Sequence, residues 1–227
     1  QKKLLKKVSQ KRRKQPFKKR FPKANKIKMQ ILTYEEVIKK YAENLDRAYE
    51  KSHNLIEQIK PVIKEKYPYL NGNLDFTMIS TQFKMRKMMQ VLSDNELKGK
   101  KILDLGCGNT QFIDDQYSRE SDYEPWLCRV LNELEIDVIG IDIGVKKTEP
   151  FESYQIDLTQ PNSLNFIQDD SIDVANAFGL FDSPWLHNYC ESNEDSLKEI
   201  LIPQLERIVK LNGLYIYYNK NAKFKNS

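Results

Sequence analysis

The sequence predicts an α/β protein built on a doubly wound, mostly parallel sheet. Along residues 101–218, short apolar runs typical of buried strands alternate with longer segments that have helical spacing. The first strand, Ile102–Leu105, runs directly into a glycine-rich turn at 106–108. A central parallel strand passes to its helix in this way, and ligands of such sheets bind beyond the carboxyl ends of the strands. The turn therefore marks the expected ligand site.

The first strand ends in a carboxylate, Asp104, immediately before the glycines. A dinucleotide would bring its pyrophosphate to this turn, where the carboxylate would repel it, and the GxGxxG spacing of NAD-type oxidoreductases is missing. The stretch Asp104, Gly106, Cys107 and Gly108 resembles motif I of the class I methyltransferases that depend on S-adenosylmethionine (SAM). SAM carries an ammonium and a sulfonium and no phosphate. The sequence departs from the family pattern at Thr110, where the last glycine is expected.

The resemblance extends over residues 101–218, because further acidic or polar residues stand at the ends of later strands. The strand 137–142 ends in Asp142, an acidic residue of the kind that accepts hydrogen bonds from both hydroxyls of a ribose. The segment 154–158 resembles the third family motif, which implies that Asp157 meets the adenine amino group. The resemblance implies a SAM site made of Asp104, Gly106, Cys107, Gly108, Asp142, Ile143, Asp157, Leu158, Asn176 and Phe178.

No catalytic residue follows from the cofactor motifs, because methyl transfer from a sulfonium chiefly requires alignment of the nucleophile with the methyl carbon. Asp182 and His187, in the loop after the fourth strand (171–178), are candidates for a base near the substrate. The stretch from Asp182 to Trp185 superficially resembles the signature of amino-group methyltransferases but lies several residues too late in the chain. Phe178 and Trp185 are candidates either to stack on a flat substrate or to pack in the core.

Charge is distributed unevenly along the 227 residues. Residues 1–30 hold 14 of the 37 Lys and Arg residues and no acidic residue, so the remaining 197 residues carry 23 basic against 32 acidic side chains, a net charge of −9. A basic arm on an acidic body favours attraction to a polyanion such as RNA, DNA or an acidic membrane surface. A nuclear or nucleolar address and a solvated tail are the alternatives.

The cysteines and histidines are too few and too scattered to form a metal site. Cys107, Cys128 and Cys190 fit neither a disulfide framework nor a zinc site, and the two histidines are His53 and His187. This usage is typical of a reducing compartment, so we expect an intracellular protein, cytoplasmic or nuclear. No run approaches the ~20 apolar residues that a membrane helix requires.

The segment 31–95 is expected to be helical and to precede a SAM-binding domain at 96–227. Thr33 and Glu36 have the spacing of a capping box, and a long helix follows that Pro61 is expected to end or bend. A second helix is predicted at about 76–92, and Arg86 within it is the candidate to reach the SAM carboxylate. In the family that the chain resembles, N-terminal helices often cover the active site.

The end of the chain differs from the family fold, which has two further strands after the fifth. A helix is expected from about Asp195 to a stop at Gly213, followed by the fifth strand at 214–218. Only nine residues follow, at 219–227. Either the sequence is a truncated piece, or the strand 214–218 is an open edge that needs a partner protein.

The sequence therefore predicts a SAM-dependent methyltransferase with an unidentified acceptor, and the basic arm favours a nucleic acid. One alternative is a non-catalytic subunit with the methyltransferase fold that binds RNA or protein, which Thr110 and the missing last strands favour. Another is a small-molecule methyltransferase.

Overall fold

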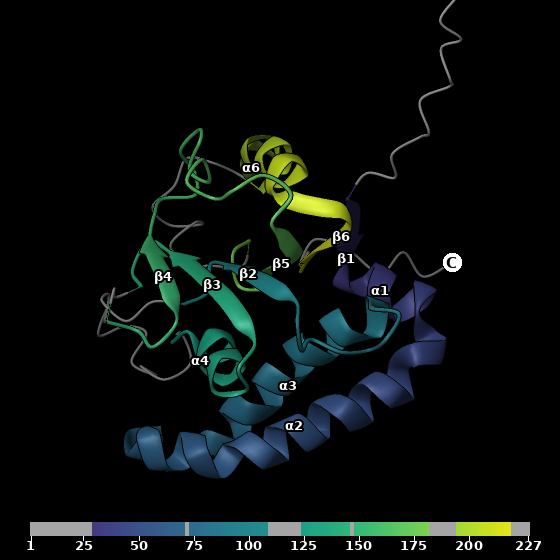
Figure 1. Ribbon diagram of the computed structural model, residues 1–227, viewed down its shortest axis with the longest axis vertical. Helices are drawn as coiled ribbons and strands as arrows, with labels where there is room; N and C mark the ends of the chain where they lie inside the picture. The colour runs from purple at the N-terminus through teal and green to yellow at the C-terminus, as the bar shows by residue number, and fades with distance from the viewer. Residues whose placement is uncertain (1–28, 71–72, 109–123, 146–147, 182–193, 219–227) are drawn as a thin grey trace, which may run out of the picture.

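The protein forms a six-stranded sheet with helices on both faces (Figure 1). The computed structural model describes residues 29–70, 73–108, 124–145, 148–181 and 194–218. The strand order is β1-β6-β5-β2-β3-β4, and every described pair of neighbours is parallel. The α/β class predicted from the sequence is confirmed, and the arrangement is Rossmann-like. The strands are β1 (Gln30–Thr33), β2 (Lys101–Leu105), β3 (Asp137–Asp142), β4 (Glu152–Gln155), β5 (Ile172–Ala177) and β6 (Val209–Tyr217).

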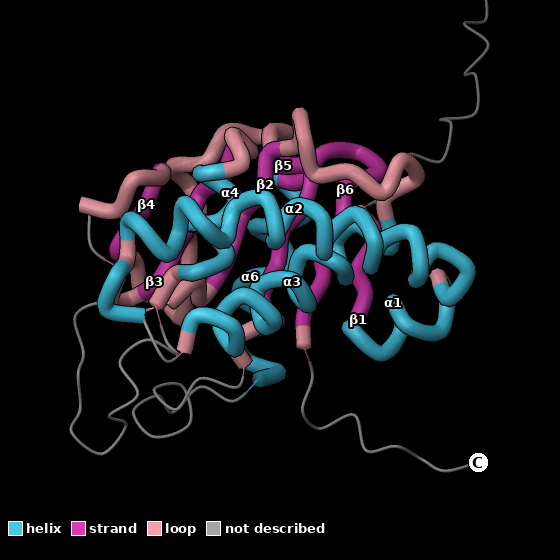
Figure 2. The backbone as a smooth tube through the Cα atoms, turned by 90° about the horizontal axis from the view of Figure 1, so that it is seen from below, coloured by secondary structure: helices cyan, strands magenta, loops and turns pink. Residues whose placement is uncertain are grey.

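Helices α1 to α4 cover one face of the sheet and α6 covers the other (Figure 1). Seen from below, α2 and α3 lie across the strands (Figure 2). The described α-helices are α1 (Tyr34–Lys40), α2 (Leu45–Lys66), α3 (Leu74–Val91), α4 (Trp126–Glu133) and α6 (Glu194–Ile208), with short 3₁₀ turns at Ala42–Asn44 and Pro68–Leu70.

Each central strand serves two hydrophobic cores, because successive side chains of a strand point to opposite faces. On β2, Ile102 packs into the core under α2, α3 and α4, whereas Leu103 and Leu105 pack into the core with α6. Since Asp104 alternates with Leu103 and Leu105, the strand directs its side chain toward the face of α3 and α4.

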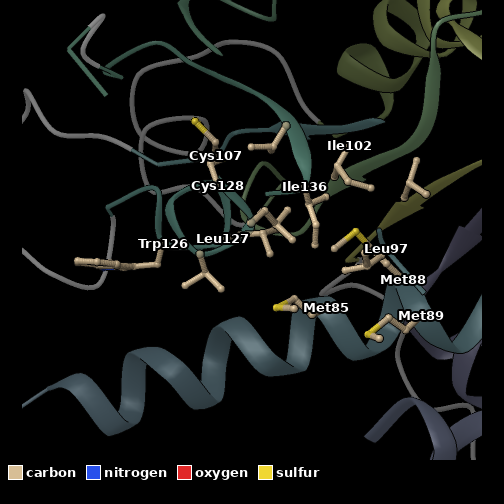
Figure 3. Close-up of a cluster of buried hydrophobic side chains, with 14 of the residues drawn as sticks. Met85, Met88, Met89, Leu97, Ile102, Cys107, Trp126, Leu127, Cys128 and Ile136 are labelled. Atoms are coloured by element: carbon tan, nitrogen blue, oxygen red, sulfur yellow. The ribbon is translucent and has the colours of Figure 1, made fainter. Parts of the chain in front are cut away.

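A methionine stripe on α3 fills much of the core under that helix. Met85, Met88 and Met89 point from α3 toward Ile102 and Leu97 (Figure 3), and all three are at most 1% exposed. Methionine is unbranched and fills irregular gaps between a helix and a sheet. The stripe is therefore part of the core.

A buried arginine fixes α4 to the segment after β3. Arg129 forms a two-fold ion pair with Glu149, with Nε–Oε2 2.9 Å and Nη2–Oε1 2.8 Å, and also pairs with Glu124. Its guanidinium lies over the rings of Tyr67 and Trp126 at 4.7 and 4.6 Å from their centroids. A buried ion pair stabilises only when its geometry is good and its hydrogen bonds are made. The contacts of Arg129 meet this condition and fix α4 to the segment between β3 and β4.

The N-terminal segment is not one long helix. The capping box at Thr33 and Glu36 forms as predicted, but α1 stops at Tyr41, whose carbonyl accepts a 2.8 Å hydrogen bond from Gln90 Nε2 on α3. A tertiary bond thus overrides the helical periodicity. Pro61 does not end the second part, since α2 continues to Lys66, and the alternative expectation of a bend at Pro61 stays a prediction. Glu57, four positions earlier, and Pro61 are both exposed, so the missing backbone hydrogen bond faces solvent.

The expectation of an open edge at 214–218 is also wrong. Strand β1, which the sequence pattern did not indicate, pairs in parallel with β6 from Gln30↔Leu214 to Thr33↔Tyr217. The N-terminal segment therefore supplies a strand of the same sheet and occupies the edge that a partner was expected to cover. The two strands that follow the fifth in the family fold have no counterpart here within the described residues.

Gly213 was predicted to end a helix, but it lies within β6, where the strand pairing is irregular. Helix α6 ends at Ile208 and β6 begins at the next residue. The pairing of β6 with β5 shifts between Ile172 and Val174, and Asn212 has φ 64°. A Cβ at Gly213 would lie 2.5 Å from Val209 Cγ1. The glycine is thus required by a tight turn of the backbone within a strand.

Candidate functional site

The centre of the candidate site is a buried polar pair at the carboxyl ends of β2 and β5. Asp104 and Asn176 are register partners, and Asn176 Nδ2 donates a 2.6 Å hydrogen bond to Asp104 Oδ1. Asp104 is 3% exposed and Asn176 is 0% exposed. A buried carboxylate is costly unless it is paired and hydrogen-bonded. The structure meets this requirement with neighbours from three other elements.

Two of these neighbours extend the pair into a continuous chain of hydrogen bonds. The Tyr34 hydroxyl donates to Asn176 Oδ1 at 2.9 Å, and Cys128 Sγ donates weakly to Asp104 Oδ2 at 3.6 Å. Burial, and then the charge of Asp104, raise the pKa of Tyr34 well above its usual value, so the hydroxyl stays protonated as a donor. The sequence did not indicate Tyr34, because it follows a four-residue strand that has no visible pattern.

The third neighbour is a cation on α3. Burial raises the pKa of Asp104 above its ordinary value, and the charge of Lys84 together with the hydrogen bonds from Asn176 and Cys128 offset part of this rise. The charge of Asp142 acts in the same direction as burial. Asp104 therefore lies in a site where added positive charge is electrostatically favoured.

The glycine turn after β2 has the tight backbone that the sequence predicted. Gly106 has φ 68° and Gly108 has φ 133°, both in the region that favours glycine. A Cβ at Gly106 would lie 3.0 Å from Leu180, in the loop after β5. The backbone N–H groups of Gly106 and Cys107 donate to the Ile141 carbonyl at 2.8 and 3.1 Å. The turn is thus held against strand β3 on one side and the loop after β5 on the other.

Asp142 joins the turns that follow β2 and β3. Its Oδ2 accepts from the Gly108 N–H at 3.2 Å and its Oδ1 accepts from the Gly144 N–H at 2.9 Å. Burial raises the pKa of Asp142, and these backbone hydrogen bonds offset part of the rise. Each oxygen of an ionised carboxylate has a second lone pair, so two further donors can be accepted. Next to it, the Ile143 carbonyl accepts from Gln155 Nε2 at 3.0 Å, which ties β4 to the same loop.

Asp157 is engaged by its own turn. Oδ1 accepts from the N–H and hydroxyl of Thr159 at 2.9 and 2.7 Å, and Oδ2 accepts from Gln160 Nε2 at 3.0 Å. Burial alone would raise the pKa of Asp157, but the hydrogen bonds from Thr159 and Gln160 bring it below the ordinary value. Leu158 is buried in the core with α6. The described contacts of Asp157 are local, and its pairing with adenine stays a prediction.

Phe178 lies one residue beyond β5, in a cluster of aromatic rings. Its centroid is 5.1 Å from that of Tyr34, 5.9 Å from that of Phe83 and 5.5 Å from that of Tyr218. Lys84 Nζ is 4.9 Å from the Phe178 centroid.

The basic residue of α3 whose charge acts on Asp104 is Lys84, whereas Arg86, the sequence-based candidate to reach the SAM carboxylate, stays a prediction. The Arg86 guanidinium packs instead on Tyr49 and Phe83, 5.9 and 5.2 Å from their ring centroids. Helical periodicity explains the difference, because residues two apart on a helix do not share a face.

Several predicted residues lie outside the described part of the chain. These are Thr110, Asp182, Trp185 and His187, together with residues 1–28 of the basic arm. Among the described residues, no three His, Cys, Asp or Glu side chains are grouped so that they could hold a metal ion. No helix in the described ranges is both long and apolar enough to cross a membrane.

The residues present fit the adenosyl part of SAM at the loops after β2 and β3. Gly106 and Gly108 form a tight turn with positive φ, in which Leu180 fills the space beside Gly106. Asp142 has acceptor capacity left for a pair of hydroxyls. The acidic environment of Asp104 suits a positively charged group. Neither protein-family models nor curated protein sequences give a match to the chain.

Proposed function

We propose that this protein is a SAM-dependent methyltransferase. The observation that carries the proposal is the placement of two carboxylates, Asp104 and Asp142, at the carboxyl ends of neighbouring strands on either side of the Gly106–Gly108 turn. A phosphate-bearing dinucleotide would be repelled there, whereas a cationic adenosyl sulfonium is attracted. The acceptor is unidentified, and the basic arm at 1–30 favours a nucleic acid.

The chain's own residues would bind and orient the cofactor. Asp142 would accept the ribose hydroxyls, the glycine turn would contact the main body of the cofactor, and Asp104 would stabilise its positive charge through the field in the site. When bound, SAM supplies an activated methyl group. The protein's contribution is then alignment of donor and acceptor, an effect worth roughly 7–11 kcal/mol in well-oriented reactions.

Calorimetric titration with SAM and with its demethylated product, S-adenosylhomocysteine, tests the proposal. The wild-type protein should bind both. Asp142→Ala should weaken binding by about tenfold or more, because hydrogen bonds to a charged group contribute roughly 1.5–3 kcal/mol. Asp137→Ala is the matched control, since Asp137 lies at the opposite end of the same strand and is exposed. Equal affinities of the two variants would refute the role of Asp142.

The alternative is a non-catalytic subunit that retains the fold. Asp157 favours it, because both of its oxygens are already held by the turn that contains Thr159 and Gln160. No heat with either SAM or S-adenosylhomocysteine would support this alternative. If binding is seen, incubation of a cell extract with tritiated SAM and the protein identifies the acceptor, by sorting the label into RNA, protein and small molecules.

A further inference from the structure

The aromatic cluster beside the buried pair of Asp104 and Asn176 is only partly covered within the described residues. Tyr34 is 2% exposed, whereas Phe83, Phe178 and Tyr218 keep an intermediate share of their surface in contact with solvent. These three rings come from α3 and from the carboxyl ends of β5 and β6. Aromatic surface at the ends of parallel strands is typical of a ligand-contacting wall.

A cation stands over this wall. Lys84 Nζ lies 4.9 Å from the centroid of the Phe178 ring, and the nearby carboxyl on which its charge acts is Asp104. The next basic residues on α3 also lie over a ring of the wall, because Arg86 and Lys87 are 5.2 and 5.3 Å from the Phe83 centroid. They differ from Lys84 in that Arg86 also packs on Tyr49 and Lys87 is only 1% exposed. A half-buried ammonium on an aromatic face can pair with an anion whose attached ring contacts the neighbouring rings.

Strand order separates this wall from Asp104 and Asp142, although the family resemblance had placed Phe178, one of its rings, in the SAM site. Asp142 ends β3 and Asp104 ends β2, whereas the rings lie at β5 and β6, and the order is β6-β5-β2-β3. A cofactor held at β2 and β3 thus leaves the wall for a second ligand. We infer that Lys84, Phe83, Phe178 and Tyr218 form the acceptor subsite, and that the acceptor is a flat ring that carries an anionic group, as a nucleotide does. This inference rests on the proposed methyltransferase function.

The test is a ligand-detected NMR titration in the presence of saturating S-adenosylhomocysteine, with uridine 5′-monophosphate, uridine and inorganic phosphate as probes. The monophosphate should bind more tightly than uridine or phosphate alone. Lys84→Gln should weaken binding of the monophosphate by about tenfold, the loss expected for one charge-assisted contact, and leave uridine unchanged. Phe83→Leu should weaken both ring-bearing probes. Lys98→Gln, which removes an exposed lysine before β2, is the matched control.

Three results would overturn the inference. One is no preference for the monophosphate over uridine, and another is equal weakening by Lys84→Gln and Lys98→Gln. The third is a loss of S-adenosylhomocysteine affinity in Lys84→Gln as large as the loss for the monophosphate, because Lys84 would then serve the cofactor carboxylate. Binding of S-adenosylhomocysteine without any binding of the monophosphate leaves the proposed function standing and removes only the subsite. Binding of the monophosphate without any binding of S-adenosylhomocysteine would refute the proposed function and support only a site for a ring that carries an anion.

Discussion

The Tyr34 hydroxyl and the Asn176 side chain form a buried 2.9 Å hydrogen bond, although 142 positions separate them in the chain. Asn176 in turn donates to Asp104. The residue that begins α1 is therefore joined to the acid at the end of β2 through a single intermediary. The N-terminal strand and helix are thus a structural part of the candidate site and not an appendage to it.

Removal of this hydroxyl should destabilise both the fold and the site. Tyr34→Phe leaves Asn176 Oδ1 without its buried donor, so we expect the free energy of unfolding to fall by about 1–2 kcal/mol and the affinity for S-adenosylhomocysteine to fall several-fold. Urea denaturation and calorimetry measure the two effects. Tyr49→Phe is the control, because Tyr49 is 49% exposed. Stability of Tyr34→Phe equal to that of the control would show that the hydrogen bond contributes nothing.

The central strands and their turns could be predicted because their signals are local. β2 and β3 follow from apolar runs, and Gly106 and Gly108 follow from a turn that requires positive φ. β1 has no such signal. Its four residues become a strand only because β6 offers an unpaired edge, which is a long-range interaction that composition and periodicity do not contain.

The residues of the candidate site likewise fall into some that the sequence could predict and some that it could not. Asp104 and Asp142 could be placed from their positions at strand ends, and the structure brings their loops together through the Gly108 N–H. Lys84 and Cys128 could not be placed, because their proximity to Asp104 depends on how α3 and α4 pack on the sheet. A sequence pattern indicates which face of a helix is apolar but not which polar residue at its border meets a given strand.

The burial of Asp104 predicts a pH-dependent cost to stability. The carboxyl has a raised pKa in the folded protein, with burial as the main cause, and its ordinary pKa of about 4 in the unfolded chain. The folded state therefore holds the proton more tightly. The contribution of Asp104 to stability is fully present below the unfolded pKa and is lost as the pH rises through the folded pKa.

Asp104→Asn should remove this dependence. The variant is expected to be more stable than the wild type at neutral pH, and the difference between their free energies of unfolding should disappear as the pH falls below the ordinary carboxyl range. Urea denaturation across acidic to neutral pH measures both curves. Affinity for S-adenosylhomocysteine should fall in the same variant, because the negative charge that suits the sulfonium is gone. A less stable variant at neutral pH would mean that Lys84 and Asn176 more than offset the burial.

The thiols of Cys107 and Cys128 should be unreactive in the folded protein. Both are buried and free. Burial raises the pKa of Cys107 to about 11 and the pKa of Cys128 well above its usual value. Since the thiolate is the nucleophile, this rise sharply lowers the reactive fraction of both thiols at mildly alkaline pH.

Labelling with a thiol reagent, followed by mass spectrometry of the peptides, measures this protection. Cys107 and Cys128 should react only as fast as the protein unfolds, and rapidly in urea, which is the internal control. Labelling of Cys107 in the folded protein at the rate of a free peptide would contradict the packing of the turn. Cys190 lies outside the described residues, so the labelling comparison is made for Cys107 and Cys128.

Gly140 should be the least tolerant position in β3, because its neighbours leave no room for a methyl group. It is the register partner of Asp104, and a Cβ there would lie 2.6 Å from Phe151 Cε2, 3.0 Å from Cys107 Sγ and 3.1 Å from Cys128 Sγ. Gly140→Ala is therefore expected to lower the free energy of unfolding by about 1–3 kcal/mol through overpacking, as measured by urea denaturation.

The matched control for Gly140→Ala is Gly179→Ala. A Cβ at Gly179 would meet only the Gly106 carbonyl oxygen, at an ordinary contact distance of 3.5 Å, so its effect should stay within about 0.5 kcal/mol. Because the displaced groups at Gly140 include Cys128, which donates to Asp104, Gly140→Ala should also weaken S-adenosylhomocysteine binding. Equal stability of the two variants would show that the strand relaxes around the added methyl, and the tight packing around Asp104 would then not be required for the site.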